Sequence, residues 1–175
     1  MSTLVFLEHH GASIQKTSLG VLSKAASLDP DTAGVVIGSG LSGLEAIAGK
    51  YGAKTLYVAD NEALGAPLPQ GRVDVISRLV KDKGFDTVLF AASVLGSDIA
   101  GGLSARLDAG LNWDLSDLEH QNGTLVGKRA ALGDTWFVLL FFTYGPLNAW
   151  IGGLGGVPEE TLDTAASWSD AKLQL

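Results

Sequence analysis

Three glycines and one aspartate make the sharpest chemical motif in the sequence. Gly38, Gly40 and Gly43 belong to the run GSGLSG, a complete G-x-G-x-x-G that follows an apolar run and opens a helical pattern. Asp60 closes the next apolar run about 20 residues on, the separation typical of dinucleotide-binding folds. In those folds the glycines let the backbone approach a pyrophosphate, the helix N-terminus attracts it, and the carboxylate binds the ribose. The motif therefore predicts a cofactor-binding loop.

The same residues have a second interpretation, in which the glycines form a turn with tight helix packing and Asp60 only ends a strand. A dinucleotide motif normally follows the first strand of its fold, whereas another strand and helix come before this one. We therefore favour the glycine-rich turn. Nucleotide binding by Gly38, Gly40, Gly43 and Asp60 stays the alternative.

A second group of polar residues follows the first apolar run of the chain. Glu8, His9 and His10 come directly after it, where the strands of an open parallel sheet usually place ligands. Adjacent residues of an extended chain point to opposite sides, so the two histidines are poorly placed to hold one metal ion. We interpret this group as a polar loop.

Three carboxylates gather further along the chain. Asp114, Asp117 and Glu119 could bind a divalent cation, but a solvated acidic edge is the more usual role of such a group, and we predict no metal site. Neither Ser39 nor Ser42 has glycine on both sides, so there is no nucleophile elbow. We expect no catalytic residue, and a protein that is not an enzyme.

Composition narrows the class of protein. The chain has 175 residues, of which 46% are hydrophobic and 18% charged, and a net charge of −7. These values indicate a globular domain with a substantial core. No cluster of Lys and Arg is present, which argues against nucleic acids and anionic membranes as partners. The lack of cysteine excludes disulfides and iron–sulfur clusters. The N-terminus enters a strand pattern without a leader segment, so we expect a cytoplasmic protein.

Apolar runs and helical patterns alternate over the first two thirds of the sequence. We predict strands at 3–7, 33–37, 55–59 and 86–92, and helices at 18–28, 41–50, 73–83 and from an N-cap at Ser97 to Gly110. Such alternation gives right-handed crossovers and a parallel sheet covered on both faces. The fold class is therefore α/β, a three-layer, Rossmann-like arrangement.

The pattern changes after Leu111. Residues 121–123 read Gln-Asn-Gly, a strong hairpin signal, and residues 124–128 form a plausible return strand. Further strands are predicted at 136–142 and 147–151, as an antiparallel extension at one edge of the sheet. We expect one domain over residues 1–157, followed by a tail or docking helix over 158–175. The apolar run at 136–151 is too short to span a membrane, because a spanning helix needs roughly 20 residues.

Three segments resemble electron transfer flavoprotein alpha subunits. They read TLVFLEHHGASIQKTSLGVLSKAASL from Thr3, KYGAKTLYVADNEAL from Lys50 and AASVLGSDIAGGLSARLDAGLNWDLSDLE from Ala91. Their order and spacing carry the resemblance over roughly residues 3–120. It implies the N-terminal domain of an alpha subunit, with a nucleotide-hydrolase-like fold.

The resemblance also implies a function. Members of the family carry electrons from dehydrogenases to a membrane quinone reductase, as heterodimers of an alpha and a beta subunit. Their FAD lies chiefly in a C-terminal domain of the alpha subunit, which we take to be absent here, so no FAD is expected on this isolated chain. The glycine-rich loop corresponds to a connection without flavin contact. Two alternatives remain: a dinucleotide-binding protein, and a stand-alone interaction domain without redox function.

Aromatic residues are concentrated late in the chain. Six of them stand between positions 136 and 150: Trp136, Phe137, Phe141, Phe142, Tyr144 and Trp150. They exceed what a single small core is expected to bury, and an apolar strip left outside is an association site. We therefore predict that the isolated chain forms a homodimer through this edge, and the resemblance implies that the same region pairs with a beta subunit.

Overall fold

The computed structural model describes residues 2–121, 124–131 and 136–141. The chain divides into two compact units, the first ending at Trp113 and the second beginning at Asp114. The predicted domain over residues 1–157 spans both units and stays a prediction. The predicted tail over 158–175 and the predicted strand over 147–151 lie outside the described residues.

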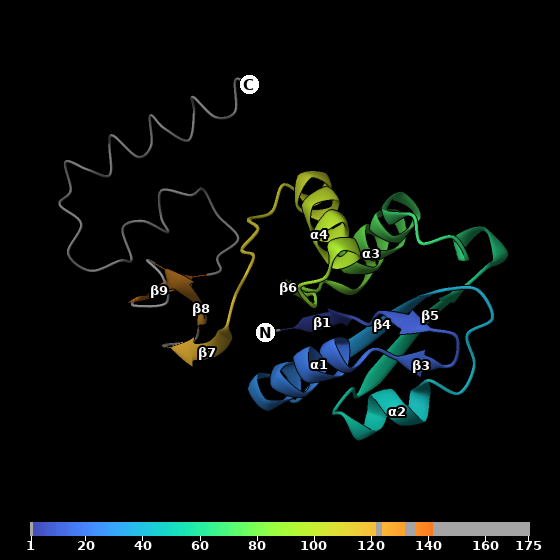
Figure 1. Cartoon of the computed structure of the whole chain (residues 1–175), viewed down its shortest axis with the longest axis horizontal. Coiled ribbons are helices and arrows are strands. Elements are labelled where there is room, and N and C mark those ends of the chain that lie inside the picture. Colours follow the sequence, from blue (N-terminus) through green and yellow to red (C-terminus); the bar gives the residue numbers. More distant parts are fainter. Residues whose placement is uncertain (1, 122–123, 132–135, 142–175) are drawn as a thin grey trace. The chain divides into compact units, whose positions relative to one another are not determined.

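The first unit is a parallel sheet between two layers of helices. Its strands are β1 (Thr3–Phe6), β4 (Ala33–Gly38), β5 (Thr55–Asp60) and β6 (Thr87–Leu89), in the order β5-β4-β1-β6. Its helices are α1 (Lys16–Leu28), α2 (Glu45–Lys50), α3 (Pro69–Lys83) and α4 (Val94–Leu107). Helices α1 and α2 lie on one face of the sheet, and α3 and α4 lie on the other (Figure 1). The predicted three-layer α/β fold is confirmed.

The two central strands explain the apolar runs of the sequence. Every residue of β1 and of β4 is buried, because helices cover both faces of these strands. The core between the sheet and the α3–α4 layer contains Leu4, Phe6, Val35, Ile37, Val73, Ile76, Ile99 and Leu103. Transfer of this apolar surface out of water, about 25 cal/mol per Å², is the main force that holds the layers together.

All four helices begin at other residues than the sequence suggests. α1 starts two residues earlier than predicted, at Lys16, and α3 starts four residues earlier, at Pro69. α2 starts at Glu45, not at residue 41, because Gly40 and Gly43 have φ of 71° and 74° and so cannot belong to a right-handed helix. α4 starts at Val94, and its N-cap is Ser93, whose side chain accepts a hydrogen bond from the Gly96 amide. The predicted N-cap at Ser97 is therefore wrong.

Three short elements were not predicted. β2 (His9–His10) and β3 (Ser13–Ile14) form a small antiparallel hairpin around Gly11, which has φ of 53°. A 3-10 turn, η1 (Glu62–Leu64), precedes α3. All of them lie in loops that follow strands of the parallel sheet.

The second unit contains an antiparallel sheet of its own. Strands β7 (Asp117–Gln121), β8 (Thr124–Ala131) and β9 (Trp136–Phe141) pair in that order, with Gln121 opposite Thr124. The predicted return strand and its antiparallel pairing are confirmed, but these strands form a separate sheet and do not extend the hydrogen-bonded edge of the parallel sheet. No described helix is long and apolar enough to cross a membrane.

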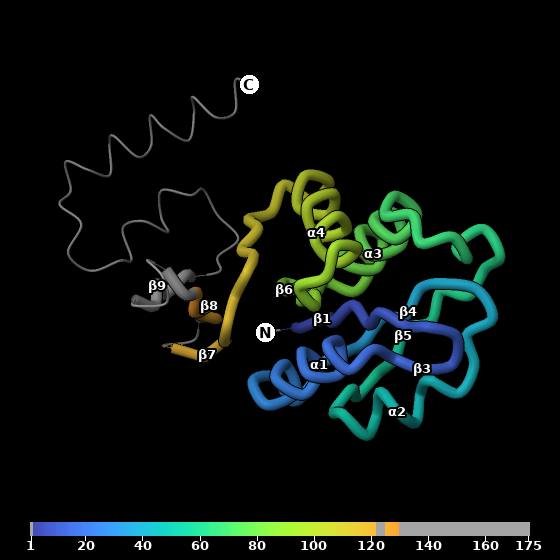
Figure 2. Tube along the Cα trace, viewed as in Figure 1, coloured from blue at the N-terminus to red at the C-terminus, as the bar shows by residue number. Residues whose placement is uncertain are grey.

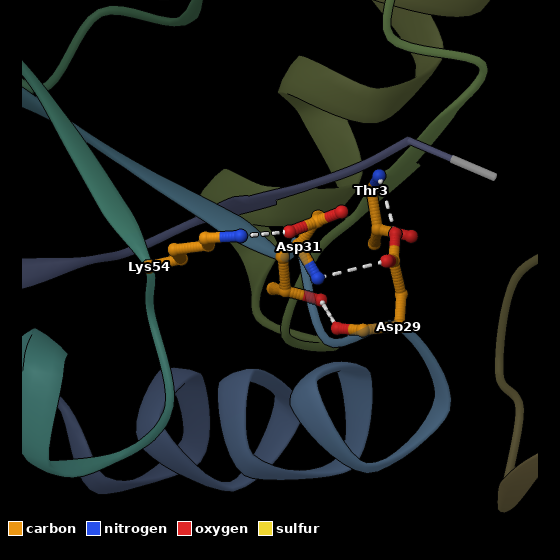
Figure 3. Close-up of polar contacts among 5 residues, drawn as sticks. Thr3, Asp29, Asp31 and Lys54 are labelled. Carbon is orange, nitrogen blue, oxygen red and sulfur yellow. Dashed lines mark hydrogen bonds and ion pairs between the residues drawn. The ribbon is translucent and has the colours of Figure 1, made fainter.

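A polar network ties together the amino ends of the parallel strands (Figure 3). Asp29, which follows α1 and is only 4% exposed, accepts hydrogen bonds from the backbone amides of Thr3 and Asp31, both at 3.0 Å. The Thr32 hydroxyl donates to the Asp29 carbonyl at 2.7 Å, and Lys54 forms an ion pair with Asp31. The network joins the end of α1 to the starts of β1, β4 and β5, so its role is structural.

Candidate functional site

The strand order places a topological switch point beside β1. From β1 the chain passes through α1 to β4 and then to β5, whereas from β5 it returns through α3 to β6 on the other side of β1 (Figure 2). The loops after β1 and β6 therefore run in opposite directions. In open parallel sheets the crevice at this position is where ligands bind.

The first glycine of the G-x-G-x-x-G motif is packed against a histidine. A Cβ on Gly38, at the end of β4, would lie 2.6 Å from Nε2 and 2.9 Å from Cε1 of His9. The His9 ring is fixed there because Nε2 lies 3.2 Å from the Ile37 carbonyl and Nδ1 lies 3.3 Å from the Gly11 carbonyl. Close approach of a side chain from the same domain thus accounts for glycine at this position.

The acidic residue of the motif binds the loop itself. The Asp60 carboxylate accepts hydrogen bonds from the backbone amides of Gly40 at 2.8 Å and of Leu41 at 2.9 Å. These are amides that a pyrophosphate would need, and they already have an anionic acceptor. Sequence reasoning was right that the four motif residues come together, since β4 and β5 pair with Gly38 opposite Asp60. Positive φ at Gly40 and Gly43 supplies the remaining reason for glycine.

Glu8 lies on the other side of β1, against the start of α4. The side chain is 6% exposed, and its Oε1 accepts a hydrogen bond of 2.5 Å from the Ser93 hydroxyl. Ser93 in turn accepts from the Gly96 amide at 2.8 Å. A Cβ on Gly96 would lie 3.4 Å from Oε1 of Glu8 and 2.4 Å from the Ala91 carbonyl oxygen. A buried carboxylate therefore sits at the positive end of the α4 dipole.

Arg72 is a buried cation at the same end of the sheet. It is 5% exposed, and its two terminal nitrogens donate to four carbonyls: those of Ala66, Leu68, Leu64 and Ile37, at 2.8 to 3.5 Å. Its Nε is buried without a hydrogen-bond partner. Burial lowers the pKa of the Arg72 guanidinium, and the charge of Glu8 partly offsets this.

Sequence reasoning missed Arg72, although a signal was available. Arg72, Ile76 and Val80 recur at spacings of four on the inner face of α3, so a charged residue on an apolar helix face could have been noticed. Its partners could not be foreseen, because they are carbonyls of a loop and of β4.

The acidic cluster of the second unit is paired with basic residues. Lys128 forms an ion pair with Glu119, and the hydrogen bond from Lys128 is the main cause that lowers the pKa of Glu119. The Oδ2 atom of Asp114 lies 3.8 Å from Nε of Arg129. Within the described part of the chain, no group of three or more His, Cys, Asp or Glu side chains could hold a metal ion.

Comparison with known proteins identifies one family. The electron transfer flavoprotein domain matches residues 3–138. The alpha subunit from Thermoanaerobacterium thermosaccharolyticum is 28% identical over 134 residues, which are 74% of this chain and 41% of that protein. The alpha subunit from Mycobacterium tuberculosis is 32% identical over 137 residues, with 77% and 42% covered. Protein FixB from Clostridium saccharobutylicum is 30% identical over 135 residues, with 74% and 40% covered. The chain thus aligns with about two fifths of each of these relatives.

Proposed function

The chain belongs to the electron transfer flavoprotein family, and on that premise we propose that it is the N-terminal domain of an alpha-type subunit, acting as a scaffold in electron transfer. In this role it pairs with a beta subunit and carries no FAD of its own. It is then part of an electron carrier and not a catalyst, and it works in the cytoplasm.

The main support for this proposal is that polar groups at the edge of the sheet already have hydrogen-bond partners within the domain. At the carboxyl ends of the strands, where an α/β domain would bind a nucleotide, Asp60 takes the loop amides and Glu8 lies against the first turn of α4. Two backbone amides of the glycine-rich loop and the Ser93 hydroxyl thus already have acceptors within the domain. This favours a domain whose task is association and not cofactor binding.

We propose that FAD is bound only in the complete complex. Flavin supplies the electron-carrying chemistry of the family, and the relatives extend well beyond the aligned two fifths. The glycine-rich loop does not fit the pyrophosphate of FAD, because its Gly40 and Leu41 amides already donate to the Asp60 carboxylate. We therefore assign FAD to a further part of the alpha-type subunit together with the beta subunit.

Co-purification with the beta subunit encoded in the same genome tests the proposal. We expect a tagged form of this chain to retain the beta subunit on an affinity column, and the pair to sediment as a one-to-one complex. As a control, Phe141→Lys changes one of the aromatics predicted to form the pairing edge, and Tyr51→Lys changes an exposed aromatic of the first unit. Pairing lost with the first variant alone would support the proposed surface. If the wild-type chain and the beta subunit sediment separately, the proposal is wrong.

The dinucleotide-binding alternative makes the opposite prediction for the glycine-rich loop. It requires the Gly40 and Leu41 amides to exchange Asp60 for a pyrophosphate. A ligand would then have to displace two hydrogen bonds of 2.8 and 2.9 Å within the domain. The third reading, an interaction domain without redox function, is favoured if the chain pairs with itself and not with a beta subunit.

A further inference from the structure

Strand β5 forms an open edge of the parallel sheet. It pairs with β4 on one side, and no described strand pairs with its other side. A strand that is paired on one side only directs every second backbone N–H and C=O group to the open side. The side chains agree with this position, since Val58 of β5 is 41% exposed whereas every residue of β4 is buried. The edge therefore offers the donors and acceptors that a further strand would need.

The opposite edge of the sheet is less suited to such pairing. Strand β6 has three residues, Thr87–Leu89, and none of them is exposed. Strand β5 has six residues, and each of them pairs one to one with a residue of β4, so the strand has no bulge. Because a longer edge can form more backbone hydrogen bonds with a new strand, β5 is the stronger candidate.

Strand β5 also lacks the features that keep other strands away from an edge. Natural edge strands carry charged side chains, proline or a bulge for this purpose, whereas β5 reads TLYVAD. The charged residues at its two ends are bound within the domain: Lys54 forms an ion pair with Asp31, and Asp60 accepts hydrogen bonds from two loop amides (Figure 3 shows the ion pair). The middle of the strand is therefore neutral and unprotected.

The sequence of β5 is complementary to a second copy of itself. A twofold axis perpendicular to the sheet beside Tyr57 would pair two β5 strands antiparallel, with Tyr57 opposite Tyr57 and Leu56 opposite Val58. Lys54 of one copy would then lie opposite Asp60 of the other, so unlike charges meet at both ends and no like charges are opposed. Aromatic and aliphatic cross-strand pairs of this kind stabilise antiparallel strands.

We propose that two copies of this chain pair through their β5 strands, so that the two parallel sheets become one continuous sheet across a twofold axis. This contact is separate from the edge over residues 136–151, for which the sequence predicts association. It does not depend on the proposed function, because β5 belongs to the first unit and takes no part in the predicted pairing with a beta subunit.

Spin labels test the pairing in the full chain, because the sequence contains no cysteine. Val58→Cys places a label on β5, and Tyr51→Cys places one at the end of α2, on a side chain of matched exposure, 41% against 40%. In the dimer the two labels at position 58 are diagonal neighbours on one face, roughly 8 Å apart. The two labels at position 51 lie at opposite ends of the strand pair. We expect dipolar broadening at position 58 alone as the protein concentration rises, and its loss when excess unlabelled wild-type chain is added.

Sedimentation of lysine variants gives the second measurement. Val58→Lys places a charge in the middle of the edge and should weaken dimerisation at least about tenfold, whereas Tyr51→Lys should leave it unchanged. A chain that stays monomeric, a dimer without broadening at position 58, or a dimer that Val58→Lys leaves intact would overturn the proposal. A label at position 58 that is immobilised in the monomer would also overturn it, because another segment of the chain then covers the edge. Should Val58→Lys fail to fold, the spin labels still decide.

Discussion

Replacement of Gly38 by alanine tests why the glycine-rich motif exists. The new Cβ would lie 2.6 Å from Nε2 of His9, well inside van der Waals contact. The ring must then move and lose its contacts of 3.2 and 3.3 Å with two carbonyls. A neutral imidazole donates from only one of its nitrogens, so one hydrogen bond of about 1 kcal/mol is lost, and overpacking costs about 1–3 kcal/mol. We therefore expect Gly38→Ala to lower the free energy of unfolding by about 2–4 kcal/mol.

The double variant Gly38→Ala/His9→Ala tests whether glycine is needed at position 38 because of the His9 ring and not because of a bound ligand. In a His9→Ala background the imidazole ring no longer lies beside Gly38, and the Leu41 Cδ2 atom at 3.4 Å from the new Cβ is an ordinary van der Waals contact. The cost of Gly38→Ala should then fall below about 0.5 kcal/mol, a coupling energy of about 2 kcal/mol between the two positions. Urea unfolding followed by far-UV circular dichroism measures all four proteins of the cycle. If Gly38→Ala is equally destabilising with and without His9, or costs nothing in the wild type, the assignment of Gly38 to His9 packing is refuted.

Three further predictions concern carboxylates. Asp60→Ala should lower the free energy of unfolding by about 1–2 kcal/mol in chemical denaturation, because two loop amides lose a charged acceptor; unchanged stability would point instead to a ligand-binding role. Asp29→Ala should cost about 2–4 kcal/mol, since it removes a buried acceptor of two amides. Asp31→Ala breaks only an exposed ion pair and should cost clearly less than Asp29→Ala. Thermal melts that rank the two variants in reverse would contradict the network. The pKa of Glu119 is lowered by its pairing with Lys128, so this pairing stabilises the fold above the ordinary pKa of glutamate, and the stabilisation is lost as the pH falls through the lowered value. In Lys128→Met, carboxyl NMR titration should show a higher pKa of Glu119 than in the wild type. An unchanged pKa would show that Lys128 is not the cause.

The layers of the first unit could be predicted from the sequence because each central strand is a continuous apolar run. β1 and β4 are buried on both faces, so their residues show no alternation and stand out from the helices between them. Helix starts were harder to predict, since local signals compete. Ser93 and Ser97 both precede helical patterns, and Ser93 is the cap because its hydroxyl bonds both Gly96 and a glutamate 85 positions away.

The contacts at the sheet edge could not be predicted in the same way. The sequence places Glu8 and His9 correctly after the first strand, but their partners lie on β4 and on the loop after β6. The sequence leaves two roles open for Asp60, as a ligand of a ribose or as a residue that only ends a strand. In the structure its carboxylate accepts hydrogen bonds from amides of the glycine-rich loop, and this depends on the pairing of β5 with β4. The hydrogen-bond acceptors of Arg72 in the structure are backbone carbonyls, and any residue type can supply a backbone carbonyl, so the sequence does not reveal them.

The proposed function requires that this domain act through its partners and hold no nucleotide at its own sheet edge. Calorimetric titration of the purified chain with FAD, and with NAD as the second ligand, tests it most directly. We expect no binding tighter than about 1 mM, close to −4 kcal/mol, and a colourless preparation. Micromolar binding that Gly40→Val or Asp60→Ala abolishes, or a yellow preparation with stoichiometric flavin, would contradict it.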